Sequence, residues 1–175
     1  MKVLIDACVL YPTVLRRIVI GAAGAGAFVP LWSARILEEW ARAAARNGAD
    51  GGAEIALLRA DWPEAEVTVN PATTARLHLP DPDDHHVLAA AIDGGATELL
   101  TLNTRDFPTR ALAAEGIIRR HPDEFLLEVL HTGSVDLAGI VAGVHGDAQR
   151  MSGTALPLRG LLKRARLPRL GKALG

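Results

Sequence analysis

Residues 81–120 constrain the fold more than any other part of the chain, because helical and strand patterns alternate there. The stretch DPDD at 81–84 precedes HHVLAAAIDGG, an Ala-rich segment typical of a helix that is capped at its start and ends at a glycine pair. A strand-like segment, ELLTL, follows at 98–102, then a polar turn, a second helical segment and another strand-like segment, GIIRR, at 116–120. This alternation predicts a parallel β-sheet flanked by helices.

The first half of the chain fits the same α/β architecture. Ser33 is the expected N-cap of the helix over residues 34–46, which should end at Asn47-Gly48. The remaining patterns predict a strand at 2–5, a helix after Pro12, a strand or extended link at 28–31, a helix at about 52–61, a strand at 66–69 and a short helix after Pro71.

The second half of the chain predicts a helical extension on this domain. Residues 123–131 have a helical pattern, and residues 134–175 contain signals for two or three helices and none for a strand. We therefore expect an α/β domain over residues 1–130 and a C-terminal helical extension over residues 131–175. The segment 159–172 of this extension carries six Lys or Arg residues and no acid.

Composition limits the function classes. With 49% hydrophobic and 22% charged residues, the chain can bury a core and is not a disordered segment. A net charge of −1 gives no argument for nucleic-acid binding, although a basic tail and a separate acidic cluster suit a polyanion handled through metal. The single cysteine, the acid at position 6 and the absence of a long apolar run predict a cytoplasmic protein without a membrane segment.

Acidic and amide side chains gather where the predicted strands end. Because the carboxyl ends of parallel strands share one edge of the sheet, we expect these side chains to converge there. They are Asp6 after the first strand, Asp81, Asp83 and Asp84 at the start of a helix, and Asn103 and Asp106 after the strand at 98–102. Clustered carboxylates repel one another unless a cation neutralises them, and oxygen ligands suit Mg²⁺ or Mn²⁺.

Each acid also has an ordinary structural interpretation. Asp6 fits a turn residue, Asp83 or Asp84 fits a helix cap, and Glu38 and Glu39 fit a solvated helix face. His85 and His86 are adjacent helix positions, about 100° apart, so one zinc ion does not suit both. We expect one histidine beside the metal site and the other in solvent.

Three sequence segments, VLIDACVLYP, PLWSARILEEWAR and DPDDHHVLAAAIDGGATELLTLNTRDFP, resemble the motifs of the PIN-domain ribonucleases, which include VapC-type toxins of bacterial toxin–antitoxin pairs. The resemblance covers residues 1 to about 125. It implies a PIN-like parallel sheet, an Mg²⁺- or Mn²⁺-dependent endoribonuclease and a cognate antitoxin. The catalytic residues that it implies are Asp6, Glu39, Asp84 and Asp106, with Asn103 and Asp81 as further metal ligands.

Two residues depart from the family pattern. Cys8 stands where many members have Asn or Ser, so we expect a hydrogen bond at the metal site to be weakened or absent. Asn103 stands where many members have a fourth acid, and Asp106 is the expected source of that charge.

The sequence therefore predicts a metal-dependent ribonuclease with RNA and an antitoxin as partners, and leaves homodimerisation open. Two alternatives remain open: a structure-specific DNA nuclease with the same metal chemistry, and a catalytically silent PIN-like module that binds RNA or protein.

Overall fold

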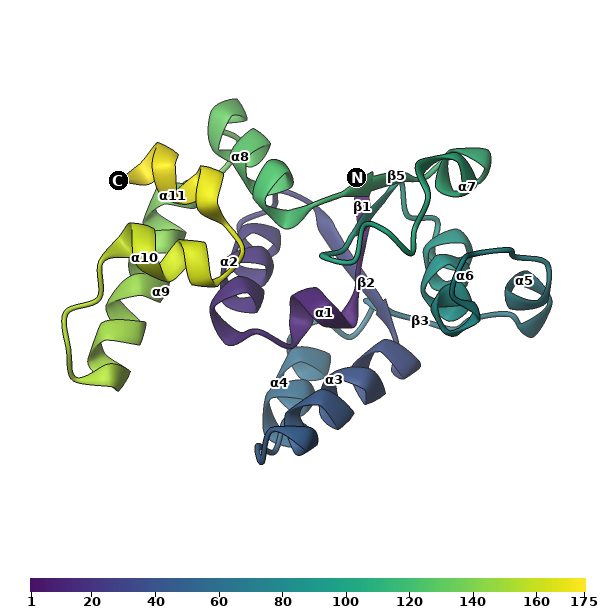
Figure 1. Ribbon diagram of the computed structural model, residues 1–175, viewed down its shortest axis with the longest axis horizontal. Coiled ribbons are helices and arrows are strands. Elements are labelled where there is room, and N and C mark those ends of the chain that lie inside the picture. The colour runs from purple at the N-terminus through teal and green to yellow at the C-terminus, as the bar shows by residue number, and fades with distance from the viewer. The chain divides into compact units, whose positions relative to one another are not determined.

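The computed structural model describes all residues 1–175 and confirms the predicted α/β class. Five parallel strands form one sheet in the order β3-β2-β1-β4-β5 (Figure 1). The strands are β1 (Lys2–Ile5), β2 (Val29–Ser33), β3 (Glu66–Val67), β4 (Glu98–Leu100) and β5 (Ile118–Arg120).

The central strands are short apolar runs because both faces of this sheet are covered. Val3, Leu4 and Ile5 of β1 have no exposed surface, and neither do Leu99 and Leu100 of β4. Continuous rather than alternating hydrophobicity is typical of a parallel strand that is buried on both sides. The predicted strands at 66–69 and 98–102 are shorter in the structure, ending at Val67 and Leu100.

By internal packing the chain divides into two units, which are described separately. The first comprises Met1–Tyr11 and Val29–Arg120, and the second comprises Pro12–Phe28 and His121–Gly175. The division at residue 130 that the sequence suggests stays a prediction. No helix of the chain has both the length and the apolar character that crossing a bilayer requires.

In the first unit, α6 packs against β1, β2, β3 and β4. Ala89, Ala90 and Ala91 of α6 are fully buried, and their small side chains let the helix approach the sheet closely. At Gly94 a Cβ atom would come within 2.8 Å of Val67 and 2.9 Å of Leu31. The helices of this unit are α1 (Ala7–Leu10), α3 (Ala34–Arg46), α4 (Gly52–Asp61), α5 (Pro71–Ala75), the 3₁₀ turn η1 (Pro82–Asp84), α6 (His85–Gly94) and α7 (Thr109–Ala114).

Helix α3 begins and ends where the sequence predicts. The Ser33 hydroxyl accepts a hydrogen bond from the Ile36 amide at 3.3 Å, and Gly48 beyond the helix has a φ of 72°. Ile36, Leu37 and Trp40 are buried. The helix therefore has a fixed start, with residues 33–39 held next to the end of β2.

The second unit is helical. It consists of α2 (Thr13–Gly24), α8 (Pro122–Thr132), α9 (Leu137–Ser152), α10 (Leu158–Arg164) and α11 (Pro168–Leu174). The rings of Phe28 and Phe125 meet edge to face at 5.2 Å, and α9 packs against both α2 and α8. The three helices after residue 134 agree with the sequence prediction, whereas α1 was not predicted.

A buried carboxylate anchors the end of this unit. Asp123, near the start of α8, is 3% exposed and accepts hydrogen bonds from the Arg169 and Leu170 amides at 2.9 and 3.0 Å. These amides belong to the first turn of α11, where N–H groups have no partner within the helix. Asp123 therefore caps α11 from another helix.

Replacing Asp123 with Ala should lower the free energy of unfolding by about 2 kcal/mol, because two buried charge-assisted hydrogen bonds are lost. Urea denaturation followed by circular dichroism measures this change. Glu124→Gln is the matched control: Glu124 pairs with Arg169 at the surface, and this change should cost about 0.5 kcal/mol or less. Equal stability of Asp123→Ala and the wild type would contradict the capping role.

Candidate metal centre

The order of the strands creates a crevice at the carboxyl ends of β1 and β4. Chain connections run outward from β1 through β2 to β3, and from β4 to β5, so the direction reverses between β1 and β4. Open parallel sheets bind ligands at such switch points. Ile5 pairs with Leu100, which brings the next residues, Asp6 and Thr101, together at this edge.

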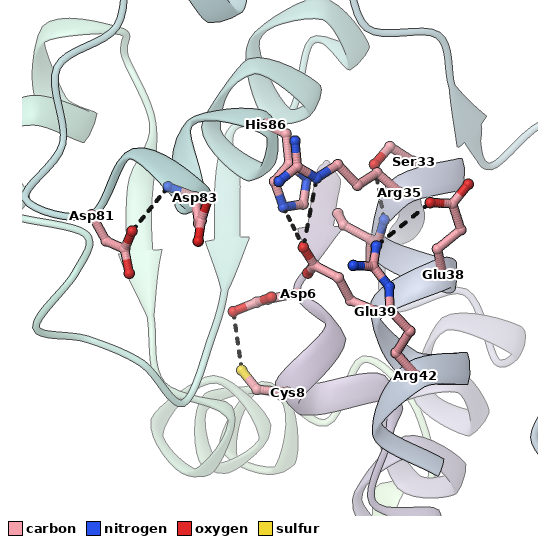
Figure 2. A network of polar contacts seen from close by, with 11 residues as sticks. Asp6, Cys8, Ser33, Arg35, Glu38, Glu39, Arg42, Asp81, Asp83 and His86 are labelled. Atoms are coloured by element: carbon pink, nitrogen blue, oxygen red, sulfur yellow. Dashed lines mark hydrogen bonds and ion pairs between the residues drawn. The ribbon is translucent and has the colours of Figure 1, made fainter. Parts of the chain in front are cut away.

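Asp6 is held by two side-chain donors. Its side chain makes no capping bond to α1, so the turn-residue interpretation does not account for the carboxylate. Instead, the Thr101 hydroxyl donates to Oδ2 at 2.7 Å. The Cys8 thiol donates to the same oxygen at 3.0 Å (Figure 2). Asp6 is 7% exposed, and its Oδ1 is left available for another ligand.

Cys8 does form a hydrogen bond at this site, so the expectation that the bond is absent is wrong, and its weakening stays a prediction. Besides donating to Asp6, the Cys8 sulfur accepts a hydrogen bond from the Leu102 amide at 3.2 Å. Burial, and then the charge of Asp6, raise the pKa of Cys8, so the group remains an S–H donor at neutral pH. Cys8 therefore does the orienting work of a hydroxyl or amide, and its protonated state does not suit a nucleophile.

Three acids from two segments form the tightest cluster. One carboxylate oxygen from each of Asp81, Asp84 and Asp106 lies within 4.8 Å of the other two. Asp81 caps η1 by accepting from the Asp83 amide at 2.9 Å, so the capping side chain is Asp81 and not Asp84. The Asn103 side-chain amide donates to Asp106 Oδ2, which holds that carboxylate in place.

The acids around Asp84 affect the pKa of this group. Burial raises its pKa to about 6, together with the negative charges of Asp6, Asp81, Asp106 and Glu39 in that order. Its Oδ2 is buried and has no hydrogen-bond partner. Four carboxylates therefore act on Asp84, and the five groups together come from four separate segments of the chain.

Glu39 reaches this region from α3, whereas Glu38 does not. Glu39 Oε1 lies 2.7 Å from His86 Nε2 and 3.8 Å from Arg35 Nε (Figure 2). Glu38 is directed to the surface, where it pairs with Arg42 at 3.6 Å. The choice of Glu39 over Glu38 thus agrees with the geometry, and its role as a ligand stays a prediction.

The two histidines also differ. His86 is 5% exposed beside Glu39, as expected for a neighbour of the site. His85 is half-buried rather than exposed, and its Nε2 accepts a hydrogen bond from the Leu79 amide at 3.1 Å. His85 therefore orders the loop before η1.

The donor set fits a hard divalent cation. All the charged groups that converge are carboxylates, which suit Mg²⁺ or Mn²⁺ rather than zinc. The unpaired, buried Oδ2 of Asp84 and the raised pKa of this group show a site whose negative charge is not balanced by protein cations. Binding of a cation there would remove this repulsion.

Sequence reasoning missed two supports of the site. Thr101 has no exposed surface, donates to Asp6 and accepts from the Asn103 amide at 2.9 Å. Arg119 of β5 donates to the Phe107 carbonyl at 2.8 Å and to the Thr104 carbonyl, and so braces the loop that carries Asp106. Thr101 could have been singled out because it directly follows a buried strand. Nothing in the sequence singles out Arg119.

This fold agrees with comparisons to known proteins. A family model described as PIN domain matches residues 2–105, and the chain belongs to the PIN-domain family. Over 61 residues it is 38% identical to the putative ribonuclease VapC50 of Mycobacterium tuberculosis, a match that covers 35% of this chain and 36% of that protein. The chain thus matches about a third of the length of that curated relative. No solved structure matches.

Asp84→Asn should stabilise the metal-free protein at pH 7.5. The pKa of Asp84 is raised from 3.8 to about 6 by folding, so its contribution to stability is lost as pH rises between those values. Because Asp84 is partly exposed, we expect an effect of about 1 kcal/mol, or roughly 2–4 °C in melting temperature. Thermal melts in EDTA at pH 4 and pH 7.5 measure this effect.

The variant should melt above the wild type at pH 7.5, with the difference smallest at pH 4. Asp83→Asn is the control, since Asp83 is exposed and does not contribute to the shift at Asp84. A melting temperature of Asp84→Asn at or below that of the wild type at pH 7.5 would show that the carboxylates do not repel one another.

Proposed function

We propose that this chain is a metal-dependent endoribonuclease that hydrolyses RNA phosphodiester bonds. The observation that carries the proposal is the convergence of four other carboxylates on Asp84, at the switch point of a PIN-domain sheet. Asp6, Glu39, Asp84 and Asp106 are the proposed catalytic residues and, with Asn103 and Asp81, the proposed ligands for Mg²⁺ or Mn²⁺. When bound, such an ion supplies an activated water and neutralises charge on the phosphodiester.

The protein's contribution to this reaction is the fixed position of the carboxylates. Thr101 and Cys8 orient Asp6, and the Asn103 amide orients Asp106. His86 at 2.7 Å restrains Glu39. Carboxylates that are positioned before substrate binds do not have to be ordered during the reaction, and this preorganisation is a main source of catalysis by electrostatics.

RNA is the preferred substrate class because the relative matched over 61 residues is described as a putative ribonuclease. The match to this relative gives no support for DNA as the substrate. Side-by-side cleavage of structured RNA, single-stranded DNA and flap DNA by the wild-type protein should give products from RNA alone. Cleavage of flap DNA at an equal or faster rate would assign the protein to the structure-specific DNA nucleases instead.

Asp6→Asn should reduce Mn²⁺-dependent RNA cleavage by about 10³-fold or more, because the carboxylate at the centre of the crevice is lost. The fold should persist, since Asn keeps the shape of Asp and can still accept from Thr101 and Cys8. Gel assays of a labelled RNA, with a melt of the same sample, measure both. Asp83→Asn should cleave at the wild-type rate, whereas full activity of Asp6→Asn would disprove the proposed site.

Metal binding separates this proposal from a catalytically silent module. Titration calorimetry with Mn²⁺ should give a dissociation constant of about 1 mM or lower for the wild type, and no measurable heat for Asp84→Asn. Equal heats for the two proteins, or none for either, would favour a silent PIN-like module that binds RNA or protein.

We further propose an antitoxin protein as the partner, with the chain acting as a cytoplasmic toxin. The support is the relation to VapC-type proteins and the run of six Lys or Arg residues at 159–172, a surface suited to an acidic partner. Expression of the chain alone should arrest growth of a bacterial host. Co-expression of the adjacent reading frame should restore growth, and arrest should be absent with Asp6→Asn; harmless expression of the active wild-type enzyme would contradict toxicity.

A further inference from the structure

A hollow of about 720 Å³ lies in the first unit next to the acidic centre. Its walls come from the start of α3, from β3 and the residues after it, from α5 and from α6. Its lining includes Arg35, Val67, Val69, Pro71, Ala75 and His86. Its size falls in the range of roughly 300–1,000 Å³ that is typical of small-ligand pockets.

The hollow is continuous with the proposed metal centre through two side chains. Arg35 and His86 both line it, and both approach the same oxygen of Glu39, at 3.8 and 2.7 Å. Figure 2 shows these two side chains at the Glu39 carboxylate, on the side away from Asp81. A polymer bound across the carboxylates would therefore pass beside the hollow.

The charge of the hollow is opposite to that of the centre. Arg35 is half exposed and makes only the long contact with Glu39. The one acid among the lining residues, Glu66, is neutralised by Arg59, which donates to both of its oxygens at 2.7 and 3.3 Å. The hollow therefore offers a cation to a polyanion that the carboxylates alone would repel.

The walls suit the flat face and the polar edge of a nucleobase. Val67, Val69, Pro71 and Ala75 give an apolar surface. β3 is an edge strand, paired only with β2, and an edge strand presents backbone donors and acceptors on its free side. Proteins read single-stranded RNA in this way, with unstacked bases packed on side chains and hydrogen-bonded at their edges.

A buried polar atom also lacks a partner here. His86 is 5% exposed, and its Nδ1 has no hydrogen-bond partner, while Nε2 lies against Glu39. Leaving such an atom unpaired is costly. Since His86 lines the hollow, an occupant with hydrogen-bonding groups can supply the missing partner.

We propose that this hollow is a nucleotide subsite, which binds a base of single-stranded RNA next to the bond that the metal centre cleaves. Arg35 contacts the neighbouring phosphate, and the apolar wall formed by β3 and α5 receives the base. The inference rests on the proposed ribonuclease function, which it deepens by assigning the part of the protein that determines base preference.

Ala75→Trp tests the subsite by filling it. Ala75 is exposed at the end of α5, so a larger side chain can be accommodated without disturbing the core. In metal-free buffer, fluorescence anisotropy should show binding of single-stranded RNA weakened by about tenfold, the loss expected when one base is displaced. In Mn²⁺, KM should rise by a similar factor and the preference for the base at the cleavage position should change, with kcat within about twofold.

Ala72→Trp is the matched control, because Ala72 is an exposed residue of the same helix outside the hollow. It should bind RNA as the wild type does. Arg35→Gln should weaken RNA binding and reduce its salt dependence, whereas Arg42→Gln, on the same helix, should not. The melting temperature and Mn²⁺ affinity of Ala75→Trp should equal those of the wild type, which shows that the fold and the metal site are intact.

Unchanged RNA affinity and base preference in Ala75→Trp would overturn the subsite, even if cleavage by the wild type is confirmed. Weakened capture of a peptide or protein partner by Ala75→Trp, with RNA binding unchanged, would assign the hollow to strand addition at β3 and would also overturn it. Base-selective RNA binding that Ala75→Trp weakens, in a protein without metal-dependent cleavage, would support the subsite and reject the nuclease proposal.

Discussion

Repulsion among carboxylates at one edge of the sheet is the constraint on which the arrangement of this protein depends. Four acids act on Asp84, and the pKa of that group rises to about 6 as a result of burial and of their charges. A chain gains nothing in stability from such an arrangement. The sheet can hold the acids together because the register of β1 and β4 places Asp6 beside Thr101. Apart from Lys2, the residues of these two strands are buried, which stabilises the sheet. The repulsion between the carboxylates is concentrated where the strand order reverses, which is where parallel sheets bind their ligands.

Most of these acids are fixed by neutral donors, whereas Oδ2 of Asp84 has no hydrogen-bond partner. Asp6 receives a hydroxyl and a thiol, Asp106 an amide, and Asp81 a backbone N–H. Glu39 lies beside two basic side chains, Arg35 and His86. Neutral donors hold a carboxylate in position without cancelling its charge, so the negative potential of the centre is kept for a ligand. For the RNA substrate that we propose, the attracting positive charge would lie beside the centre, at Arg35.

The sequence was sufficient for the parallel sheet and for most elements, because patterns such as VLI before Asp6 and the Ala-rich segment after Asp84 have one physical interpretation each. It was also sufficient to bring Asp6, Asp84 and Asp106 to one edge. It was insufficient for contacts that depend on register and rotamer. The contact of Thr101 with Asp6 depends on the pairing of β1 with β4, and the role of Asp123 depends on the start of α11 lying against α8. Element α1 is a single turn, too short to leave a periodic pattern.

The departures at Cys8 and Asn103 appear as losses in the sequence, but in three dimensions each is compensated. A buried thiol with a raised pKa donates to Asp6 and accepts from Leu102, so it replaces a hydroxyl or amide without changing the charge. Asn103 donates its amide to Asp106 and thereby fixes an acid three residues further along the same loop. The negative charge that the position of Asn103 lacks is supplied by Asp106, which lies within the tight cluster. A chain under no requirement for a cation has no physical reason to keep that charge, because removing it would relieve the repulsion at Asp84.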